Sequence, residues 1–168
     1  MGTFSHFTSD GDVHMVNVGA KTSTDRRARA SAKIQMQATT LEAIVNKQTS
    51  KGDVLQVARL AGIMGAKQTS HLIPLCHPLA LTGVEVSLSP LNPTTLKITA
   101  DVSTHGQTGV EMEALTAVST AALTVYDMCK SIDRDMSIQS IQLVDCLLYT
   151  SDAADEGLGV DLGGRRII

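Results

Sequence analysis

Asp127 and Lys130 are the strongest candidates for proton transfer in this chain. Residues 114–125 contain only Ala, Leu, Val, Thr and Ser, a composition that predicts a buried helix. Asp127 and Lys130 follow it three positions apart, so on a continued helix they share one face. Because the helix dipole disfavours an acid in the last turn, helix stability does not explain Asp127. We therefore predict a functional role for this pair.

Two further acids, Glu111 and Glu113, precede the same apolar stretch. The simplest interpretation is that they complement the helix dipole. Glu113 and Asp127 are separated by roughly 21 Å on a straight helix that rises about 1.5 Å per residue. One substrate cannot easily reach both ends in one chain. If both ends serve a site, we expect a two-fold dimer with antiparallel long helices to bring them together.

Cationic side chains occur in two places. Lys21, Arg26 and Arg27 lie in a segment with loop composition, and they form either a solvated surface or an anion-binding site, since Arg matches phosphate oxygens. Lys51 precedes a predicted helix N-terminus at Asp53, where backbone N–H groups favour anions. It is either an exposed lysine or one placed over a phosphate or a reacting carbonyl.

Cys76 and His77 lie between Pro74 and Pro78, which exclude a regular helix or a central strand there. Several interpretations stay open. A zinc site lacks further ligands at suitable spacing, and adjacent residues rarely act as nucleophile and base. The pair is otherwise structural, or His77 hydrogen-bonds a ligand.

Composition narrows the class of protein. Of 168 residues, 43 % are hydrophobic, 18 % charged and 2 % aromatic, and the net charge is −3. Few aromatic residues and no basic run argue against a nucleic-acid partner, and no apolar run is long enough for a membrane span. Three cysteines without framework spacing fit a reducing cytoplasm, so we expect a cytoplasmic protein.

The pattern of elements predicts one α+β domain over residues 1–145, with a mobile terminus at 1–12. Expected strands are 14–18, 28–37, 84–89, 96–103 and 136–144. A capping box at 39–42 opens a short helix. Asp53 caps a second helix, whose apolar stripe is Val54, Val57, Ala58, Ala61 and Met64. With the long helix, this order predicts a ferredoxin-like split βαβ sheet whose helices pack on one face.

Six motifs together resemble the cyclic pyranopterin monophosphate synthase family of molybdenum-cofactor biosynthesis, over about residues 10–145. They are His14-Met15-Val16, Lys51-Gly52-Asp53, Ala66-Lys67-Gln68-Thr69, Ile73-Pro74-Leu75-Cys76-His77-Pro78, Gly109-Val110-Glu111-Met112-Glu113-Ala114-Leu115 and Tyr126-Asp127-Met128-Cys129-Lys130. The resemblance implies a lyase that converts 3',8-cyclo-7,8-dihydroguanosine 5'-triphosphate to cyclic pyranopterin monophosphate and pyrophosphate. It also implies a hexamer, built as a trimer of dimers, with sites at the dimer interface.

The resemblance assigns roles to residues at matching positions. Catalysis falls to Lys51, Asp127 and Lys130. The substrate-binding set is Leu75, Cys76, His77, Glu111, Met112, Glu113, Lys67, Arg26 and Lys21, the cations among them serving the triphosphate. No metal ligand and no cofactor is required, although Mg²⁺ would arrive with the triphosphate. We expect burial to oppose the charged forms of Asp127 and Lys130, and their pairing to favour them.

The chain departs from the family after Asp145. The family continues into a Gly- and Lys-rich loop over the substrate phosphates, whereas residues 146–168 contain no lysine. Residues 146–156 resemble translated read-through of a sequencing adaptor, so we expect 146–168 to be a disordered, non-family tail and substrate binding to be weak. An inactive nucleotide-triphosphate-binding homologue is therefore the alternative function, and a purely structural assembly subunit is a third.

Overall fold

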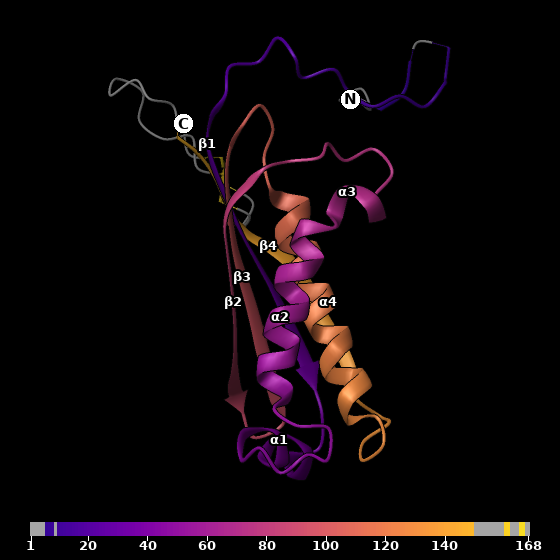
Figure 1. Ribbon diagram of the computed structural model, residues 1–168, viewed down its shortest axis with the longest axis vertical. Coiled ribbons are helices and arrows are strands. Elements are labelled where there is room, and N and C mark those ends of the chain that lie inside the picture. The colour runs from indigo at the N-terminus through magenta and orange to yellow at the C-terminus, as the bar shows by residue number, and fades with distance from the viewer. Residues whose placement is uncertain (1–5, 9, 150–159, 162–164, 167–168) are drawn as a thin grey trace.

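The computed structural model describes residues 6–8, 10–149, 160–161 and 165–166, and it places two long helices against one face of a sheet (Figure 1). The elements are β1 Thr24–Gln35, α1 Ala38–Val45, α2 Val54–Lys67, α3 Thr69–Leu72, β2 Leu81–Asn92, β3 Thr95–Gly106, α4 Glu111–Cys129, β4 Ser137–Tyr149, β5 Val160–Asp161 and β6 Arg165–Arg166. None of the helices in the described part of the chain is long and apolar enough to cross a membrane.

The main sheet has the strand order β2-β3-β1-β4, and every neighbouring pair in it is antiparallel. The first and last strands therefore lie side by side, as do the two strands of the central hairpin. This arrangement confirms the predicted α+β, ferredoxin-like fold. Short β5 and β6 pair with each other in a separate two-stranded sheet.

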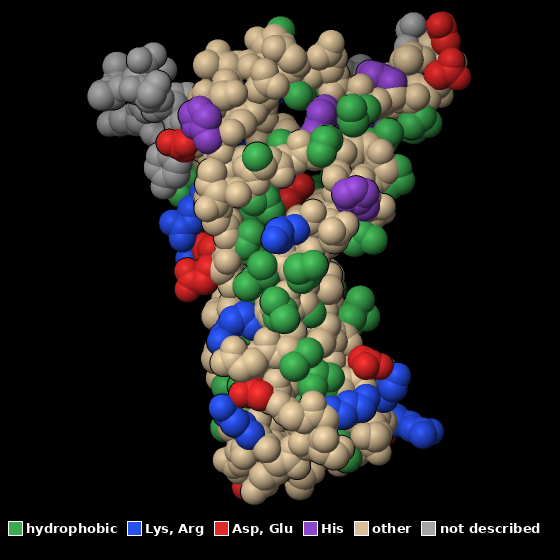
Figure 2. All heavy atoms as spheres, in the orientation of Figure 1, with side chains coloured by type: hydrophobic (Ala, Val, Ile, Leu, Met, Phe, Trp, Pro, Cys, Tyr) green, Lys and Arg blue, Asp and Glu red, His purple; other side chains and the backbone are tan. Residues whose placement is uncertain are grey.

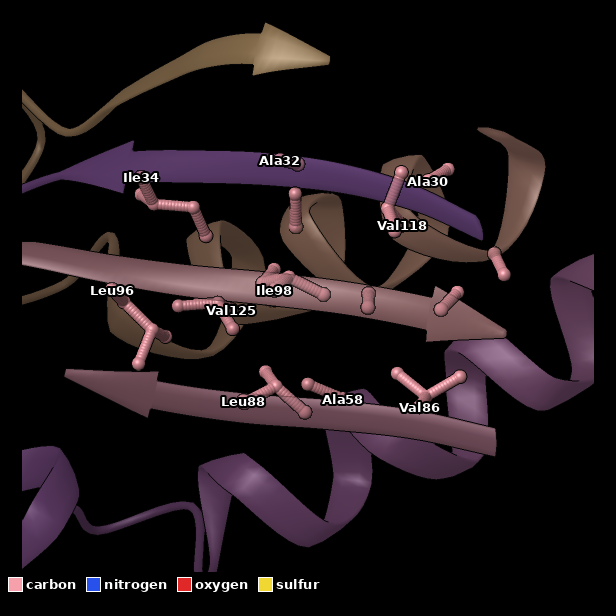
Figure 3. Close-up of a cluster of buried hydrophobic side chains, with 14 of the residues drawn as sticks. Ala30, Ala32, Ile34, Ala58, Val86, Leu88, Leu96, Ile98, Val118 and Val125 are labelled. Carbon is pink, nitrogen blue, oxygen red and sulfur yellow. The ribbon is translucent and has the colours of Figure 1, made fainter. Parts of the chain in front are cut away.

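The core lies between the sheet and the helices, and small side chains fill much of it. Alternate β1 residues, from Ala28 to Ile34, are buried on the helix side, as the two-residue period of a strand requires. Figure 3 shows side chains of the three strands β1, β2 and β3 meeting Val118 and Val125 of α4 and Ala58 of α2. The apolar run of α4 is buried as predicted, because it packs on both β1 and α2.

Helices α2 and α4 approach closely where α2 carries glycines. A Cβ on Gly62 would lie 3.0 Å from the Ala117 carbonyl oxygen, and one on Gly65 would lie 2.8 Å from the Thr120 Cβ. The helices run antiparallel, so the start of α2 lies beside the end of α4 (Figure 1). This contact fixes the relative position of residues at both ends of the helix layer.

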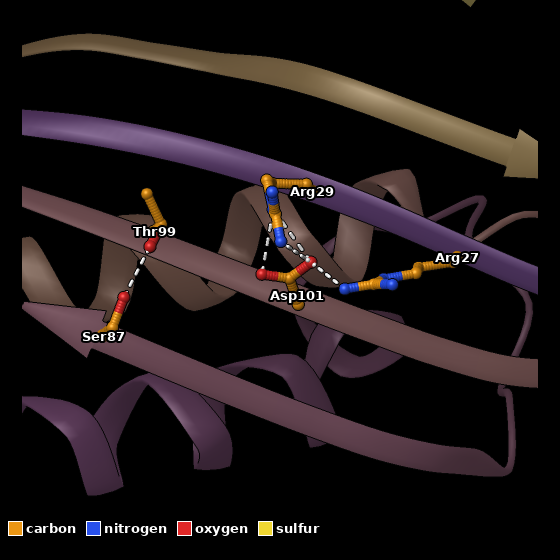
Figure 4. Close-up of polar contacts among 5 residues, drawn as sticks. All are labelled: Arg27, Arg29, Ser87, Thr99 and Asp101. Carbon is orange, nitrogen blue, oxygen red and sulfur yellow. Dashed lines mark hydrogen bonds and ion pairs between the residues drawn. The ribbon is translucent and has the colours of Figure 1, made fainter. Parts of the chain in front are cut away.

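The opposite face of the sheet is polar (Figure 4). Asp101 accepts hydrogen bonds from Arg27 and Arg29, each at 2.9 Å, and Ser87 lies 2.6 Å from Thr99 between their hydroxyl oxygens. The prediction that residues 21–27 form one cationic loop is wrong, because β1 begins at Thr24. Strand alternation sends Arg26 and Arg27 to opposite faces of the sheet.

Other local predictions were also wrong. Residues 14–18 form no strand, and Val13 alone bridges Phe7. Helix α1 has no side-chain cap from its own sequence, so the capping box does not form. The apolar stripe predicted for α2 is only partly right, since Val54 and Ala58 are buried. Val57 and Met64 are 43 % and 47 % exposed, because the buried face of α2 contains Gly62 and Gly65 instead. A single turn of helix, α3, precedes Pro74.

The expected disorder from residue 146 is wrong for residues 146–149. These residues continue β4, and Cys146 pairs with Ala28 of β1. Backbone hydrogen bonding to an existing strand does not depend on side-chain identity, which explains how this sequence extends the sheet. The remainder of the expected tail, apart from β5 and β6, lies outside the described residues, as do residues 1–5 and 9 of the expected mobile terminus.

Candidate active site

The three residues proposed for catalysis meet at the C-terminal end of α4. Asp127 lies in its last turn, and Lys130 follows at the C-cap position. The Lys130 Nζ donates to the Asp127 Oδ1 at 2.6 Å. The Lys51 Nζ comes from the loop before α2, donates to the Asp127 backbone oxygen at 3.0 Å, and lies 3.9 Å from its Oδ2. One carboxylate thus lies between two ammonium groups.

The loop that carries Lys51 is held at both ends. Asp53 caps α2 by accepting from the Gln56 N–H, and its other carboxylate oxygen lies 2.9 Å from the Lys47 Nζ. Gly52 has a φ of +95°, a conformation that favours glycine. The predicted N-cap at Asp53 is confirmed, and it fixes the start of α2 two residues after Lys51.

Pairing governs the charges of this cluster. The hydrogen bond from Lys130, with its charge and that of Lys51, lowers the pKa of Asp127 below its ordinary value. The hydrogen bond to Asp127 in turn raises the pKa of Lys130. The two side chains are 63 % and 53 % exposed, so the expected opposition from burial is weak in this chain. The resting pair is a carboxylate and an ammonium ion at neutral pH.

A second group of predicted residues lies at the other end of α4, in and around its first turn. Glu113 is 4 % exposed, and burial, followed by the charge of Glu111, raises its pKa. Burial also raises the pKa of the Cys76 thiol, with a smaller effect from the charge of Glu113. Met112 is 36 % exposed between the two acids.

His77 contacts the backbone of the segment before β1. Its Nε2 lies 2.7 Å from the Val16 carbonyl oxygen, and since a carbonyl only accepts, Nε2 carries the proton. The remaining nitrogen, Nδ1, is then an acceptor in the neutral ring. Leu75 and Cys76 are half-buried in the same loop. A raised thiol pKa disfavours the thiolate that a cysteine nucleophile needs.

The predicted phosphate-binding cations are less tightly grouped. Arg26 is half-buried on the helix side of β1, and its buried Nε has no hydrogen-bond partner among the described residues. The Cys146 thiol donates to the Glu111 Oε1 at 2.9 Å. Burial, together with this bond and the charge of Glu111, raises the pKa of Cys146 to about 12, and the positive charge of Arg26 opposes the shift. Lys67 ends α2, at the end of the molecule where α4 begins (Figure 1). Lys21 is exposed before β1.

The predicted residues therefore form two groups, which we name the acidic end and the basic end. The acidic end contains Cys76, Glu111 and Glu113, and the basic end contains Lys51, Asp127 and Lys130. Figure 2 shows the helix side of the molecule, with histidines only in its upper half and basic side chains beside an acidic one at the lower right. The length of α4 keeps the two groups apart in one chain. Within the described residues, no three His, Cys, Asp or Glu side chains gather as metal ligands would.

Sequence reasoning missed two residues near the basic end. Lys47, which pairs with Asp53, has a positive φ of 56° that no sequence pattern indicated. Asp133 is 2 % exposed and contacts the start of α1. A second acid so soon after the end of a helix was the available signal, because the dipole disfavours acids there.

Comparison with known proteins identifies the family of this chain. The MoaC family profile matches residues 15–146. A curated protein of Desulfitobacterium hafniense (strain DSM 10664 / DCB-2), named cyclic pyranopterin monophosphate synthase, is 55 % identical over 141 residues, which cover 84 % of this chain and 86 % of that protein. Since the profile spans most of the chain and the relative is similar over most of both lengths, this chain belongs to the MoaC family.

Proposed function

We propose that this chain is a cyclic pyranopterin monophosphate synthase, a lyase of molybdenum-cofactor biosynthesis. It would convert 3',8-cyclo-7,8-dihydroguanosine 5'-triphosphate to cyclic pyranopterin monophosphate and release pyrophosphate. The observation that carries the proposal is the convergence of Lys51 and Lys130 on Asp127, in a chain of the MoaC family. The named relative supports the choice of reaction.

The basic end suits the proton transfers of ring opening and closure. Lys130 and Asp127 present a proton donor and an acceptor within one hydrogen bond. A substrate that separates the pair would remove the stabilising partner of each, so their pKa values would move toward each other. Lys51 adds a second positive charge for the triphosphate. Any Mg²⁺ would enter bound to the triphosphate oxygens.

The acidic end suits recognition of the ring derived from guanine. Carboxylates accept from N–H groups, so Glu111 and Glu113 can bind the N–H edge of that ring. Burial raises the pKa of Glu113 above its ordinary value, because it disfavours the charged form. Arg26 is half-buried on the helix side of β1, and its guanidinium group is the kind of side chain that binds a phosphate.

Both ends would form one site only across two subunits. The outer face of the helix layer carries exposed apolar side chains suited to such contact, with Leu60 at 61 %, Leu123 at 60 % and Met64 at 47 % exposed. A two-fold partner packed there with its α4 antiparallel would place its basic end beside the acidic end of the first subunit. We propose this dimer as the active unit, and a hexamer of three such dimers as the assembly.

Subunit complementation tests the shared site. Asp127→Asn disables the basic end and Glu113→Ala the acidic end, so each variant alone should release little pyrophosphate. After unfolding and refolding together, mixed dimers contain one intact site, and random pairing should restore about a quarter of the activity of the unaltered chain. No restoration, in mixtures shown to exchange subunits, would mean that both ends must be intact in the same chain and would refute the shared arrangement.

The segment after Asp145 decides whether the chain is active as it stands. We would measure pyrophosphate release with this chain and with a version carrying a Gly- and Lys-rich loop after Asp145. Turnover by the second version alone would assign the loss to the tail. If both bind the triphosphate and neither turns over, the chain is an inactive binding homologue and the proposed function is wrong.

A further inference from the structure

Asp133 is a buried acid outside both groups of predicted residues. It lies in the turn between α4 and β4 and is 2 % exposed. Its backbone N–H donates to the Cys129 carbonyl, which closes the turn onto the end of α4. Its carboxylate accepts three hydrogen bonds, and none of these comes from a charged group. A buried carboxylate is costly unless such bonds compensate it, so its presence requires an explanation.

The partners of Asp133 lie mainly at the start of α1. The Gln37 backbone N–H and the Thr40 hydroxyl both donate to its Oδ2, at 2.8 Å and 3.1 Å. Helix α1 has no side-chain cap from its own sequence and no acid in its first turn. The unpaired N–H groups and the positive dipole end of a helix favour a carboxylate. Asp133 thus supplies from 96 positions away the cap that α1 lacks.

This tie joins the two segments that carry the lysines of the basic end. Lys130 lies three positions before Asp133 in the turn. Helix α1 leads directly into the loop that carries Lys51. The Tyr126 hydroxyl also donates to the Arg134 carbonyl at 3.3 Å, so the turn is held against α4 as well. Movement of α1 relative to this turn would change the separation of the two ammonium groups.

We propose that Asp133 is a positioning residue, which ties α1 to the turn after α4 and thereby holds Lys51 and Lys130 together on Asp127. The catalytic consequence of this inference rests on the proposed function, whereas the geometric role of Asp133 does not. Asp133 itself does not contact the reacting groups in this arrangement, because its carboxylate is buried and its oxygens are occupied.

Four variants separate positioning from general stability. Asp133→Ala removes all three bonds, and Asp133→Asn keeps an acceptor for Gln37 and Thr40. Thr40→Val removes a single bond and provides a mild alternative should Asp133→Ala fail to fold. Thr104→Val is the matched control, because Thr104 is also buried and donates one bond, to the Ala80 carbonyl at 2.7 Å, far from the basic end.

The first readout is kinetic, in the version of the chain that turns over. Misplacement of a catalytic group by about 1 Å costs on the order of a hundredfold in rate, so Asp133→Ala should lower kcat by tens-fold or more with a smaller change in KM. Asp133→Asn should recover most of the loss, and Thr104→Val should change kcat by less than about twofold because bonds at distant sites act independently. Equal losses in Asp133→Ala and Thr104→Val would overturn the proposal.

The second readout needs no activity. Titration of the Lys130 side chain by NMR, assigned with Lys130→Arg, reports its pairing with Asp127, which raises its pKa. In Asp133→Ala and, to a smaller extent, Thr40→Val, this pKa should move toward the ordinary lysine value. An unchanged titration in these folded variants would overturn the proposal. If the unaltered chain and the version with a Gly- and Lys-rich loop after Asp145 both lack activity, the proposed function fails, while this titration still decides the positioning role.

Discussion

Replacing Gly65 with alanine tests the closest contact between α2 and α4. A Cβ at this position would lie 2.8 Å from the Thr120 Cβ and 3.3 Å from the Thr116 carbonyl oxygen, whereas carbon atoms pack best at about 3.5–4.0 Å. Thr120 cannot rotate away freely, because its hydroxyl donates to the Thr116 carbonyl at 2.8 Å. The helices must therefore separate, or Thr120 must lose its bond.

The two opposing contributions can be compared. Alanine gains about 0.5–1 kcal/mol over glycine inside a helix, and overpacking a filled site costs about 1–3 kcal/mol. We therefore expect Gly65→Ala to lower the free energy of unfolding by about 1 kcal/mol, the difference between the midpoints of these two ranges. Thr120→Ala in the same chain should relieve the clash, with a coupling energy of about 1 kcal/mol between the two changes.

Urea unfolding at one fixed protein concentration measures this effect, since association would otherwise alter apparent stability. Unchanged m-values would show that the midpoint shift reports stability. Thr120→Ala alone provides the control. A Gly65→Ala variant more stable by about 0.5–1 kcal/mol would show helix propensity acting without a clash. That result would refute the close α2–α4 contact described above.

Three further predictions concern charged groups. Asp127→Asn should abolish pyrophosphate release with little change in the urea midpoint, because exposed ion pairs contribute little to stability; equal losses of activity and folding would contradict its catalytic role. Glu113 has a raised pKa in the fold, so it binds a proton more readily there than in the unfolded chain, and its contribution to stability falls as pH rises above about 4.5. Glu113→Gln should therefore raise the urea midpoint at pH 7 and flatten that decline, and a lower midpoint would contradict the burial argument. Burial alone would raise the pKa of Asp101, yet the hydrogen bonds from Arg29 and Arg27 lower it overall. Asp101 therefore stabilises the fold at pH values above its ordinary pKa of 3.8, and this stabilisation is lost as the pH falls through the pKa of Asp101 in the folded state. Asp101→Asn should reduce stability by about 1 kcal/mol at pH 7, and the difference from the unaltered chain should shrink in acid unfolding measurements.

Much of the fold followed from local periodicity. The apolar run of residues 114–125 predicted the core of α4, and Asp53 was correctly identified as the cap of α2. Prediction failed where a local pattern had a competing tertiary partner. Thr39 began an apparent capping box, yet α1 begins one residue earlier, at Ala38, and the N–H of its N-cap residue Gln37 donates to the distant Asp133. Val57 matched an apolar stripe, yet the close approach of α4 turned the glycine face of α2 inward.

The candidate site was predictable in its residue types and only partly in its arrangement. The pairing of Asp127 with Lys130 followed from their spacing, because helical geometry brings residues three apart together. The sequence also separated Glu113 from Asp127, since the rise of a helix fixes that distance. By itself, then, the sequence determined the order of the elements, the two ends of α4 and the chemistry at each end.

Only the tertiary structure decided which distant segments meet there. Lys51 reaches Asp127 across 76 positions, and Asp133 reaches Gln37 across 96. Pairing of β1 with β3 likewise decided that Arg27 meets Asp101, 74 positions away. The contacts of Lys51 and Asp133 depend on how the helices pack on the sheet and on each other. That packing depends on side-chain volumes, for example on the absence of a Cβ at Gly62 and Gly65. Local periodicity determines which face a residue occupies, and packing between layers determines what that face meets.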